Sequence, residues 1–248
     1  MPTNKITKYR VLKPGPYGRV LPLVLAILDG WGVNKRPHHG DPTVAAHTPF
    51  MKDIQTHYPT VLLAAHGKSV GLPNEQDGNS EAGHLNLGAG RIVDQDALYI
   101  SKSIKDGTFF KNGALQAAIA HVKRNRSAIH LMGLLSNYNS GHASPDHVLA
   151  LLKLMEQQKV KNVYIHFFTD GRDSPRYDAV KFLTEVEKRF RGQEMVASLC
   201  GRFYAMDRKK DWSHTERAYN LLTLGEGISE ISPENALRHA YNRGESDE

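Results

Sequence analysis

The segment AIHLMGLL at residues 128–135 decides the fold, because it is the first of three short apolar stretches that alternate with amphipathic ones. The other two are VKNVYIHFF at 160–168 and MVASLCGRF at 195–203. Runs of this length that are rich in branched and aromatic side chains are typical of buried strands. Apolar residues at helical spacing follow the strands, in residues 146–157, 178–191 and 214–224. The alternation predicts an α/β fold with a mostly parallel sheet and helices on both faces.

The same pattern extends toward the amino terminus. We predict two further strands and two further helices there, at residues 21–28 and 60–66 and at residues 48–57 and 112–126. Thr48 is the predicted N-cap of the first of these helices, with Pro49 at its first position. The second helix has an apolar face made of Leu115, Ala118, Ile119 and Val122. Because ligands bind beyond the carboxyl ends of strands in such sheets, the residues that follow the strands are the candidates for function.

Composition and charge exclude several protein classes. The chain has 248 residues and a formal net charge of +6. Residues 1–20 hold five of the 32 Lys and Arg residues and no acid, so the rest is almost neutral. A nucleic-acid-binding protein should carry its basic residues on the folded face, so we predict no nucleic-acid partner and a disordered basic extension over residues 1–20. The longest apolar run, Val20–Leu28, is shorter than the roughly 20 residues of a membrane span, so we predict no membrane span.

The single cysteine, Cys200, excludes an intrachain disulfide and fits a reducing, cytoplasmic compartment. We interpret Cys200 as a small buried hydrophobic residue of a strand and not as a nucleophile, because its neighbours on the amino-terminal side are Val196-Ala197-Ser198-Leu199.

Asp29 follows the first predicted strand, in the turn Asp29-Gly30-Trp31-Gly32. An acid at the end of a strand is well placed to bind a cation through oxygen. The alternative, which the spacing alone supports equally, is an Asx turn in which the carboxylate caps its own backbone.

Residues 77–91, DGNSEAGHLNLGAGR, form the densest motif. Ser80 lies at a glycine-flanked helix start, where backbone N–H groups and the helix dipole favour a phosphate group. Serine needs a base or a metal to become a nucleophile, and since no Ser-His-Asp arrangement is evident, a metal is the simpler activator. The alternative for Ser80 alone is an N-cap.

Two arginine-containing motifs also follow predicted strands. In DGRDSP at 170–175, Arg172 can bind an anion and Asp173 can accept a proton; the alternative is an exposed turn with an ion pair. In GRFYAMDR at 201–208, Arg202 and Arg208 could face one carboxylate or phosphate; the alternative is a solvated charged loop, which is our interpretation of Lys209-Lys210.

The polar stretch 136–147 contains two histidines, His142 and His147, that could be ligands, acid–base groups or neither. His147 begins a predicted helix, so we interpret it as structural.

Together, the motifs at 29–32, 77–91, 170–175 and 201–208 resemble those of the cofactor-independent (2,3-bisphosphoglycerate-independent) phosphoglycerate mutases, a branch of the alkaline-phosphatase-like metalloenzymes. The resemblance runs from about Leu21 to the last residue, with the motifs in the family's order. It implies that Ser80 is phosphorylated in mid-reaction and that Asp29 and Ser80 bind one of two divalent cations. His142, Arg172, Asp173, Arg202 and Arg208 would then line the substrate site, with Asp173 as general acid–base.

The activity that this resemblance implies is the interconversion of 3-phosphoglycerate and 2-phosphoglycerate by two phosphoryl transfers, without added 2,3-bisphosphoglycerate. The metal would be Mn²⁺, with Mg²⁺ or Co²⁺ as alternatives, and the complete enzyme would be a cytoplasmic monomer whose only partner is its small-molecule substrate. Two other hypotheses are a metal-dependent phosphomonoesterase of the same superfamily and a non-catalytic phosphoglycerate-binding module.

The sequence departs from the family in two ways. Asn137 stands where the family has an acid, in a loop lengthened before His142. The chain is also about half as long as family members and has no counterpart of their later Asp and His ligands. We therefore expect an amino-terminal fragment that is inactive alone. Its expected parts are the extension 1–20, the first part of a metal-binding phosphatase-like domain at 21–93 and a truncated substrate-binding transferase domain at 94–248.

Overall fold

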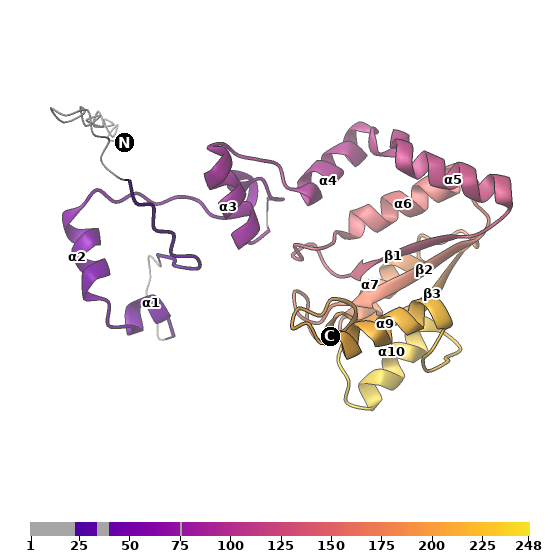
Figure 1. Cartoon of the computed structure of the whole chain (residues 1–248). Coiled ribbons are helices and arrows are strands. Elements are labelled where there is room, and N and C mark those ends of the chain that lie inside the picture. The colour runs from indigo at the N-terminus through magenta and orange to yellow at the C-terminus, as the bar shows by residue number, and fades with distance from the viewer. Residues whose placement is uncertain (1–22, 34–39, 75) are drawn as a thin grey trace. The chain divides into compact units, whose positions relative to one another are not determined.

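The computed structural model describes residues 23–33, 40–74 and 76–248. The chain divides into two compact units, at residues 1–62 and 63–248. Figure 1 shows the three-stranded sheet and most of the helices in the second unit. The expected boundary near residue 93 concerns the domains of longer proteins and stays a prediction, as does the basic extension at residues 1–20, which lies outside the described residues.

The described part of the first unit contains two helices, α1 (Pro42–Ala45) and α2 (Pro49–His57). The second agrees with the predicted helix, and Thr48 takes the N-cap position, although its side chain makes no capping bond. The predicted strand at 21–28 is wrong over its described residues, 23–28, where Leu23 and Val24 are 93% and 84% exposed. The predicted strand at 60–66 is wrong as well. A strand needs a neighbour to pair with, and the described residues offer none to either segment.

The sheet of the second unit consists of β1 (Ile129–Leu135), β2 (Val163–Thr169) and β3 (Glu194–Gly201). All pairs are parallel and the strands lie in sequence order, so the predicted parallel α/β architecture is confirmed. The predicted β2 began three residues too early. Val160 belongs instead to the turn that follows α6, where its N–H donates to the carbonyl of Met155 at 3.0 Å.

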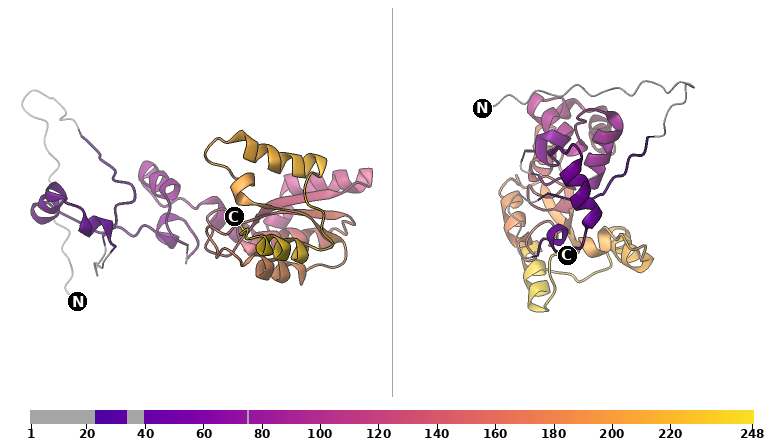
Figure 2. Two further views of the ribbon diagram at one scale, coloured as in Figure 1. Left: turned by 90° about the horizontal axis from the view of Figure 1, so that it is seen from below. Right: turned by 90° about the vertical axis from the view of Figure 1, so that its left-hand side faces the viewer.

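Helices connect and cover these strands. Their bounds are α5 (Gly113–Asn125), α6 (Pro145–Gln157), α7 (Ala179–Glu187), α9 (Trp212–Leu224) and α10 (Pro233–Asn242). In the left-hand view of Figure 2, α9 and α10 lie on opposite sides of the sheet, which confirms helices on both faces. The helix predicted at residues 178–191 is too long, because α7 ends four residues before residue 191, and α10 was not predicted.

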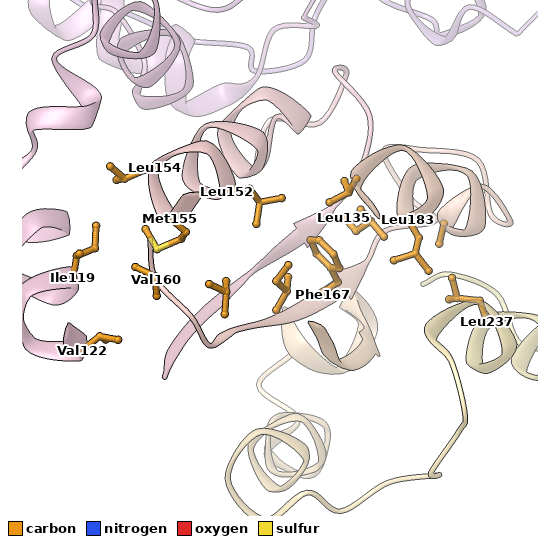
Figure 3. Packing of buried hydrophobic residues seen from close by; sticks show 14 residues of the cluster. Ile119, Val122, Leu135, Leu152, Leu154, Met155, Val160, Phe167, Leu183 and Leu237 are labelled. Atoms are coloured by element: carbon orange, nitrogen blue, oxygen red, sulfur yellow. The ribbon is translucent and has the colours of Figure 1, made fainter. Parts of the chain in front are cut away.

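The larger of two hydrophobic clusters among the described residues lies between the sheet and the helices α5, α6, α7 and α10, and the smaller consists of Val70, Leu72 and Ala82. Figure 3 shows Ile119 and Val122 of α5, Leu154 and Met155 of α6 and Phe167 of β2 within this cluster. The predicted apolar face of α5 is confirmed at Ile119 and Val122, but Ala118 is exposed. Burial of these side chains fixes the sheet, and with it the places where its strands end.

The segment before α5 contains α3 (Ser80–Ala89), α4 (Asp96–Asp106) and two short turns of 3₁₀-helix, η1 (Gly67–Val70) and η2 (Phe109–Lys111). A last short helix, α8 (Arg202–Ala205), begins where β3 ends. The predicted third strand ran on to residue 203, so its last two residues belong instead to this helix. Within the described part of the chain, no helix is long and apolar enough to cross a membrane.

Candidate active site at the carboxyl ends of the strands

One polar side chain follows each strand, and the three meet at one edge of the sheet. Ser136 comes after β1, Asp170 after β2 and Arg202 after β3. The Ser136 hydroxyl donates to Oδ2 of Asp170, and Arg202 Nη1 donates to its Oδ1 at 2.6 Å. Parallel strands end at the same edge, so the topology that the sequence predicts is what brings these residues together.

Asp173 and Ser140 complete this arrangement, which we call the strand-end cluster (Ser136, Ser140, Asp170, Asp173 and Arg202). The same Nη1 of Arg202 donates to Oδ2 of Asp173 at 2.9 Å, and the Ser140 hydroxyl donates to that oxygen at 3.0 Å. The side chain of Asp170 is 0% exposed, whereas that of Asp173 is 30% exposed. Asp173 is therefore the carboxylate of the cluster that can exchange a proton with a bound molecule.

The electrostatics of the cluster favour the charged forms. Burial by itself raises the pKa of Asp170, but hydrogen bonds from Ser136, from Arg202 and from the backbone N–H groups of Asp173 and Arg172 outweigh it, and the pKa lies below its ordinary value. Burial lowers the pKa of Arg202, but its bonds to the two carboxylates raise it further than burial lowers it. A guanidinium fixed between two carboxylates is held rigidly at the sheet edge, and its positive charge is balanced by theirs.

The loop 136–142 follows β1 and carries His142. Asn137, the departure from the family pattern, accepts a hydrogen bond from the N–H of Asn139 at 2.9 Å and so forms a local turn. The His142 N–H donates to the Ser140 hydroxyl at 3.2 Å, and the His142 side chain is exposed. His147 lies on α6, where its Nε2 is 2.9 Å from the Ser101 hydroxyl. Burial lowers the pKa of His147, in keeping with a structural role.

The other two predicted arginines are placed differently from Arg202. Arg172 is 61% exposed at its side chain, and its Nη1 lies 3.9 Å from a carboxylate oxygen of Glu248. Arg208 is exposed beyond α8, next to the exposed Lys209 and Lys210. The two arginines of the 201–208 motif therefore lie in different environments, one buried among carboxylates and one in solvent.

Ser80 is the first residue of α3, and Asn79, not Ser80, is the N-cap. The side-chain oxygen of Asn79 accepts from the N–H of Ala82 at 2.9 Å. The alternative interpretation of Ser80 as the cap of this helix is therefore wrong. The position that we predicted for its hydroxyl, at a helix start, is confirmed.

One contact of Ser80 was not predicted. Nδ1 of His84, one turn later on α3, lies 3.2 Å from the Ser80 hydroxyl and 2.8 Å from the Ser80 carbonyl oxygen. A carbonyl oxygen only accepts, so the shorter bond requires a hydrogen on Nδ1. That nitrogen is then no base for Ser80. The spacing of four residues on a helix is the signal for this contact.

Asp29 occupies a turn, as predicted. The N–H of Trp31 donates to the carbonyl of Leu28 at 3.0 Å, and Gly30 has a φ of +81°, which favours glycine. Asp29 also lines a hollow of about 480 Å³ within the first unit, together with Ile27, Leu28, Gly30, Trp31, Pro42 and Thr43.

The described residues do not form a metal site by themselves. Within 23–33, 40–74 and 76–248, no group of three or more His, Cys, Asp or Glu side chains is arranged to hold a metal ion. Asp29 and Ser80, the two predicted ligands, belong to different units of the chain. Their shared role stays a prediction.

Cys200 lies on β3 with intermediate exposure, and burial raises the pKa of its thiol. A raised pKa keeps the thiol protonated, which supports our interpretation that it is not a nucleophile.

Sequence reasoning did not select Asp170, Ser136, Ser140 or Gln76, all of which are buried beside the predicted residues. Ser136 and Asp170 directly follow strands that the sequence predicts, so the strand ends were a usable signal. Gln76 directly precedes the 77–91 motif. Nothing in the sequence spacing connects it to Ser140, although the Ser140 carbonyl accepts a hydrogen bond from the Gln76 side chain at 2.8 Å.

Comparisons with known proteins agree on one family. Residues 100–248 match the family model described as BPG-independent PGAM N-terminus. The chain is 47% identical over 230 residues to 2,3-bisphosphoglycerate-independent phosphoglycerate mutase 1 of Methanosarcina barkeri, a match that covers 92% of this chain and 44% of that protein. It is 44% identical over 229 residues to the corresponding mutase of Moorella thermoacetica, with the same two coverages.

A solved structure is similar as well. Phosphoglycerate mutase of Leishmania mexicana, studied at low cobalt concentration, matches with a TM-score of 0.73 and 29% identity over 82% of this chain and 39% of that one. The chain therefore spans less than half the length of these relatives.

Proposed function

This chain belongs to the BPG-independent phosphoglycerate mutase family, and from that membership we propose that it supplies the phosphate-accepting serine and part of the substrate site for the interconversion of 3-phosphoglycerate and 2-phosphoglycerate. The observation that carries the proposal is the link between two motifs. The turn before Ser80 bonds to Ser140 through Gln76, and Ser140 bonds to Asp173. The proposed nucleophile and the proposed acid–base residue thus belong to connected segments.

The proposed reaction has two transfers. The Ser80 oxygen attacks the phosphorus of 3-phosphoglycerate, a Ser80 O–P bond forms, the P–O bond to carbon 3 breaks, and the glycerate oxygen takes up a proton. The glycerate then turns, its 2-hydroxyl loses a proton and attacks the phosphoserine, and the Ser80 O–P bond breaks. Asp173 holds the proton that moves between the hydroxyls, because it is the carboxylate of the strand-end cluster that is partly exposed.

Charged and polar groups bind the substrate in this proposal. Arg202 is held in one position by its bonds to Asp170 and Asp173, while the exposed side chains of Arg172, Arg208 and His142 are available to bind the carboxylate and phosphate of the ligand. Holding glycerate between the two transfers favours return of the phosphoryl group over its loss to water.

We also propose a divalent metal, Mn²⁺ with Mg²⁺ or Co²⁺ as alternatives, with Asp29 and Ser80 among its ligands. The relative studied with cobalt supports a metal requirement. In this proposal the remaining ligands come from the part of the relatives that this chain does not span. The enzyme would act in glycolysis as a cytoplasmic monomer, and the single cysteine is consistent with a reducing compartment.

The test is a product assay. The 248-residue chain, alone and mixed with the carboxyl-terminal remainder of the Methanosarcina barkeri relative, is incubated with 3-phosphoglycerate and Mn²⁺. We expect 2-phosphoglycerate from the mixture only, and a loss of more than about a thousandfold with Ser80→Ala.

Ser103→Ala is the matched control, because its hydroxyl bonds only locally within α4, to the carbonyl of Ile100 at 2.7 Å, and it should retain full activity. Free phosphate without 2-phosphoglycerate would instead support a phosphomonoesterase. Turnover that survives Ser80→Ala would contradict the proposed nucleophile.

A further inference from the structure

Gln76 is a buried amide that lies between the two halves of the proposed site. Its residue is 3% exposed, and its backbone is fixed at both ends: its N–H donates to the carbonyl of Pro73 at 3.1 Å, and its carbonyl accepts from the N–H of Gly67 at 3.0 Å. These two bonds fix the backbone of Gln76 against Pro73 and against Gly67, the first residue of η1. Four residues later α3 begins at Ser80.

The side chain of Gln76 reaches the loop that leads to Asp173. Its Nε2 donates to the carbonyl of Ser140 at 2.8 Å, across 64 residues of sequence. Ser140 is itself 3% exposed, and its hydroxyl donates to Asp173 while it accepts from the N–H of His142. One amide therefore restrains the residue that orients both Asp173 and the backbone at His142.

The neighbouring glycine shows how closely the two segments approach. A Cβ atom added at Gly141 would lie 3.4 Å from Nε2 of Gln76 and 3.9 Å from Nδ2 of Asn79. Asn79 is the N-cap of α3, so the bend at Ser140–Gly141 packs directly against the start of the helix that carries Ser80. The contact is local to the second unit of the chain.

The other end of the amide is unsatisfied. Oε1 of Gln76 is buried and accepts no hydrogen bond from the residues that the structure describes. A buried acceptor without a donor costs free energy, and this cost offsets the gain from the Nε2 bond. An apolar side chain of similar length would remove this acceptor but would leave the Ser140 carbonyl without its donor, so the amide contributes little net stability and its main effect is on the position of the loop.

From these contacts we propose that Gln76 is a positioning residue that fixes the loop 136–142, and through Ser140 the Asp173 carboxylate, against the start of the Ser80 helix. The inference deepens the proposed function, on which its consequence for substrate binding rests. Gln76 acts through Ser140 and touches no reacting atom.

The experiment compares amide hydrogen exchange in the 248-residue chain and in Gln76→Met, which keeps the length of the side chain and removes the amide. We expect exchange in residues 136–142 to become roughly five- to tenfold faster, the effect of losing one hydrogen bond. The urea midpoint should change little, because the substitution removes one unmet acceptor, Oε1, and leaves another, the Ser140 carbonyl. Gln76→Glu, whose carboxylate cannot donate to the Ser140 carbonyl, should loosen the same loop and serves as a second variant.

Gln116→Met is the matched control. Gln116 also donates from Nε2 to a backbone carbonyl, that of Phe110 at 2.6 Å, but this bond stays between η2 and α5. It should speed exchange near Phe110 and leave 136–142 unchanged. Unchanged exchange at 136–142 in Gln76→Met would overturn the proposal, and so would a uniform rise across the unit with a lower urea midpoint, which indicates a merely structural role.

Calorimetric titration with 3-phosphoglycerate separates this inference from the proposed function. If the unmodified chain binds, Gln76→Met should bind roughly tenfold more weakly and Gln116→Met equally well; equal binding by Gln76→Met would overturn the link to the substrate site. If the unmodified chain does not bind, the part of the proposed function that assigns substrate binding to this chain fails. The exchange data then still decide whether Gln76 positions the loop.

Discussion

Arg202 bonds to two carboxylates with one nitrogen atom, but only one of those carboxylates is completely shielded from water. Asp170 has no exposed side-chain surface, and Arg202 itself is 7% exposed. In such surroundings the removal of one partner leaves an uncompensated charge, which is far more costly than the loss of an ion pair on the surface. The stability of the strand-end cluster therefore depends on Asp170, and its chemistry depends on Asp173.

We expect Asp170→Asn to lower the free energy of unfolding by about 2–3 kcal/mol, at the low end for a broken buried pair because Asp173 still contacts Arg202. Urea unfolding followed by circular dichroism measures the change. Glu185→Gln removes the carboxylate of an exposed pair, 2.6 Å from Lys188, and should leave the curve unchanged. Equal effects of the two substitutions would show that burial does not control the Asp170 pair.

Some residues of the candidate site were predicted from the sequence and others were missed, and each outcome has a physical reason. Asp173 and Arg202 follow apolar strands, and a parallel sheet brings strand ends together. That reasoning could not rank Asp170 against Asp173, because which carboxylate is buried depends on packing against distant segments. Gln76 was out of reach for the same reason: its partner is 64 residues away.

For helices and strands, the spacing of apolar residues predicted those elements whose formation depends on a buried apolar face. The strands β1 to β3 and the helices between them were predicted because apolar spacing sets their buried faces. Residues 23–28 have an equally apolar sequence, yet they are extended without pairing among the described residues. A strand exists only with a partner, and one chain segment cannot reveal whether a partner is present.

The cap of α3 gives a prediction at this scale. Asn79→Ala removes the acceptor of the Ala82 N–H and should lower the free energy of unfolding by about 1 kcal/mol, measured in urea. Because the first turn of α3 carries Ser80, the mutase activity of the complemented chain should fall as well.

Asn112→Ala is the control, since Asn112 caps α5 by accepting from the N–H groups of Ala114 and Leu115 at 3.0 and 3.2 Å. It should cost similar stability and leave activity unchanged. A parallel loss of activity in both variants would mean that stability, and not the Ser80 turn, explains the effect.

A row of polar side chains across the sheet gives a pH-dependent prediction. Nδ1 of His130 on β1 lies 2.9 Å from Nε2 of His166 on β2, whose Nδ1 lies 2.8 Å from the Ser198 hydroxyl on β3. Burial, and then the neighbouring His130, lower the pKa of His166. The unfolded chain, with an ordinary pKa near 6.5, then binds this proton at a higher pH than the folded chain does.

Stability should therefore fall as the pH is lowered from 6.5 toward the folded-state pKa of His166, because protonation favours the unfolded chain over that interval. His166→Asn should make the curve shallower between pH 7 and pH 5, as measured by urea unfolding at each pH. His121→Asn, at an exposed position on α5, is the control and should keep the wild-type slope. An unchanged slope in His166→Asn would contradict the assignment.

Within the unit 63–248, the last residues of the chain return to the edge where the strands end. The carbonyl of Asp247 accepts from the Thr169 hydroxyl at 2.6 Å, and the N–H of Phe203 donates to the carbonyl of Glu248 at 2.8 Å. The approach is so close that a Cβ atom on Gly201 would lie 2.3 Å from that carbonyl oxygen. This segment thus packs against the ends of both β2 and β3, beside the strand-end cluster.

Asp247 is the residue on which this packing depends. Its carboxylate accepts from the N–H of Ala179 at 2.9 Å and from the Tyr241 hydroxyl, and it is 2% exposed. Burial raises the pKa of Asp247, although its hydrogen bonds oppose the rise, so the surrounding donors stabilise the charged form against the effect of burial. The carboxylate thereby joins the start of α7 to α10, and the backbone carbonyl of the same residue bonds to the end of β2.

Asp247→Ala should lower the free energy of unfolding by about 2–3 kcal/mol, because it leaves the buried donors of Ala179 and Tyr241 without an acceptor. Urea unfolding measures the loss, and hydrogen exchange should become faster in residues 170–174, which the displaced segment contacts at Gly171. Glu245→Ala, which breaks the exposed pair with Arg243, should change neither result. If the two variants behave alike, the return of the chain to the sheet edge does not support the turn that carries Asp173, and the site must be held by the strands alone.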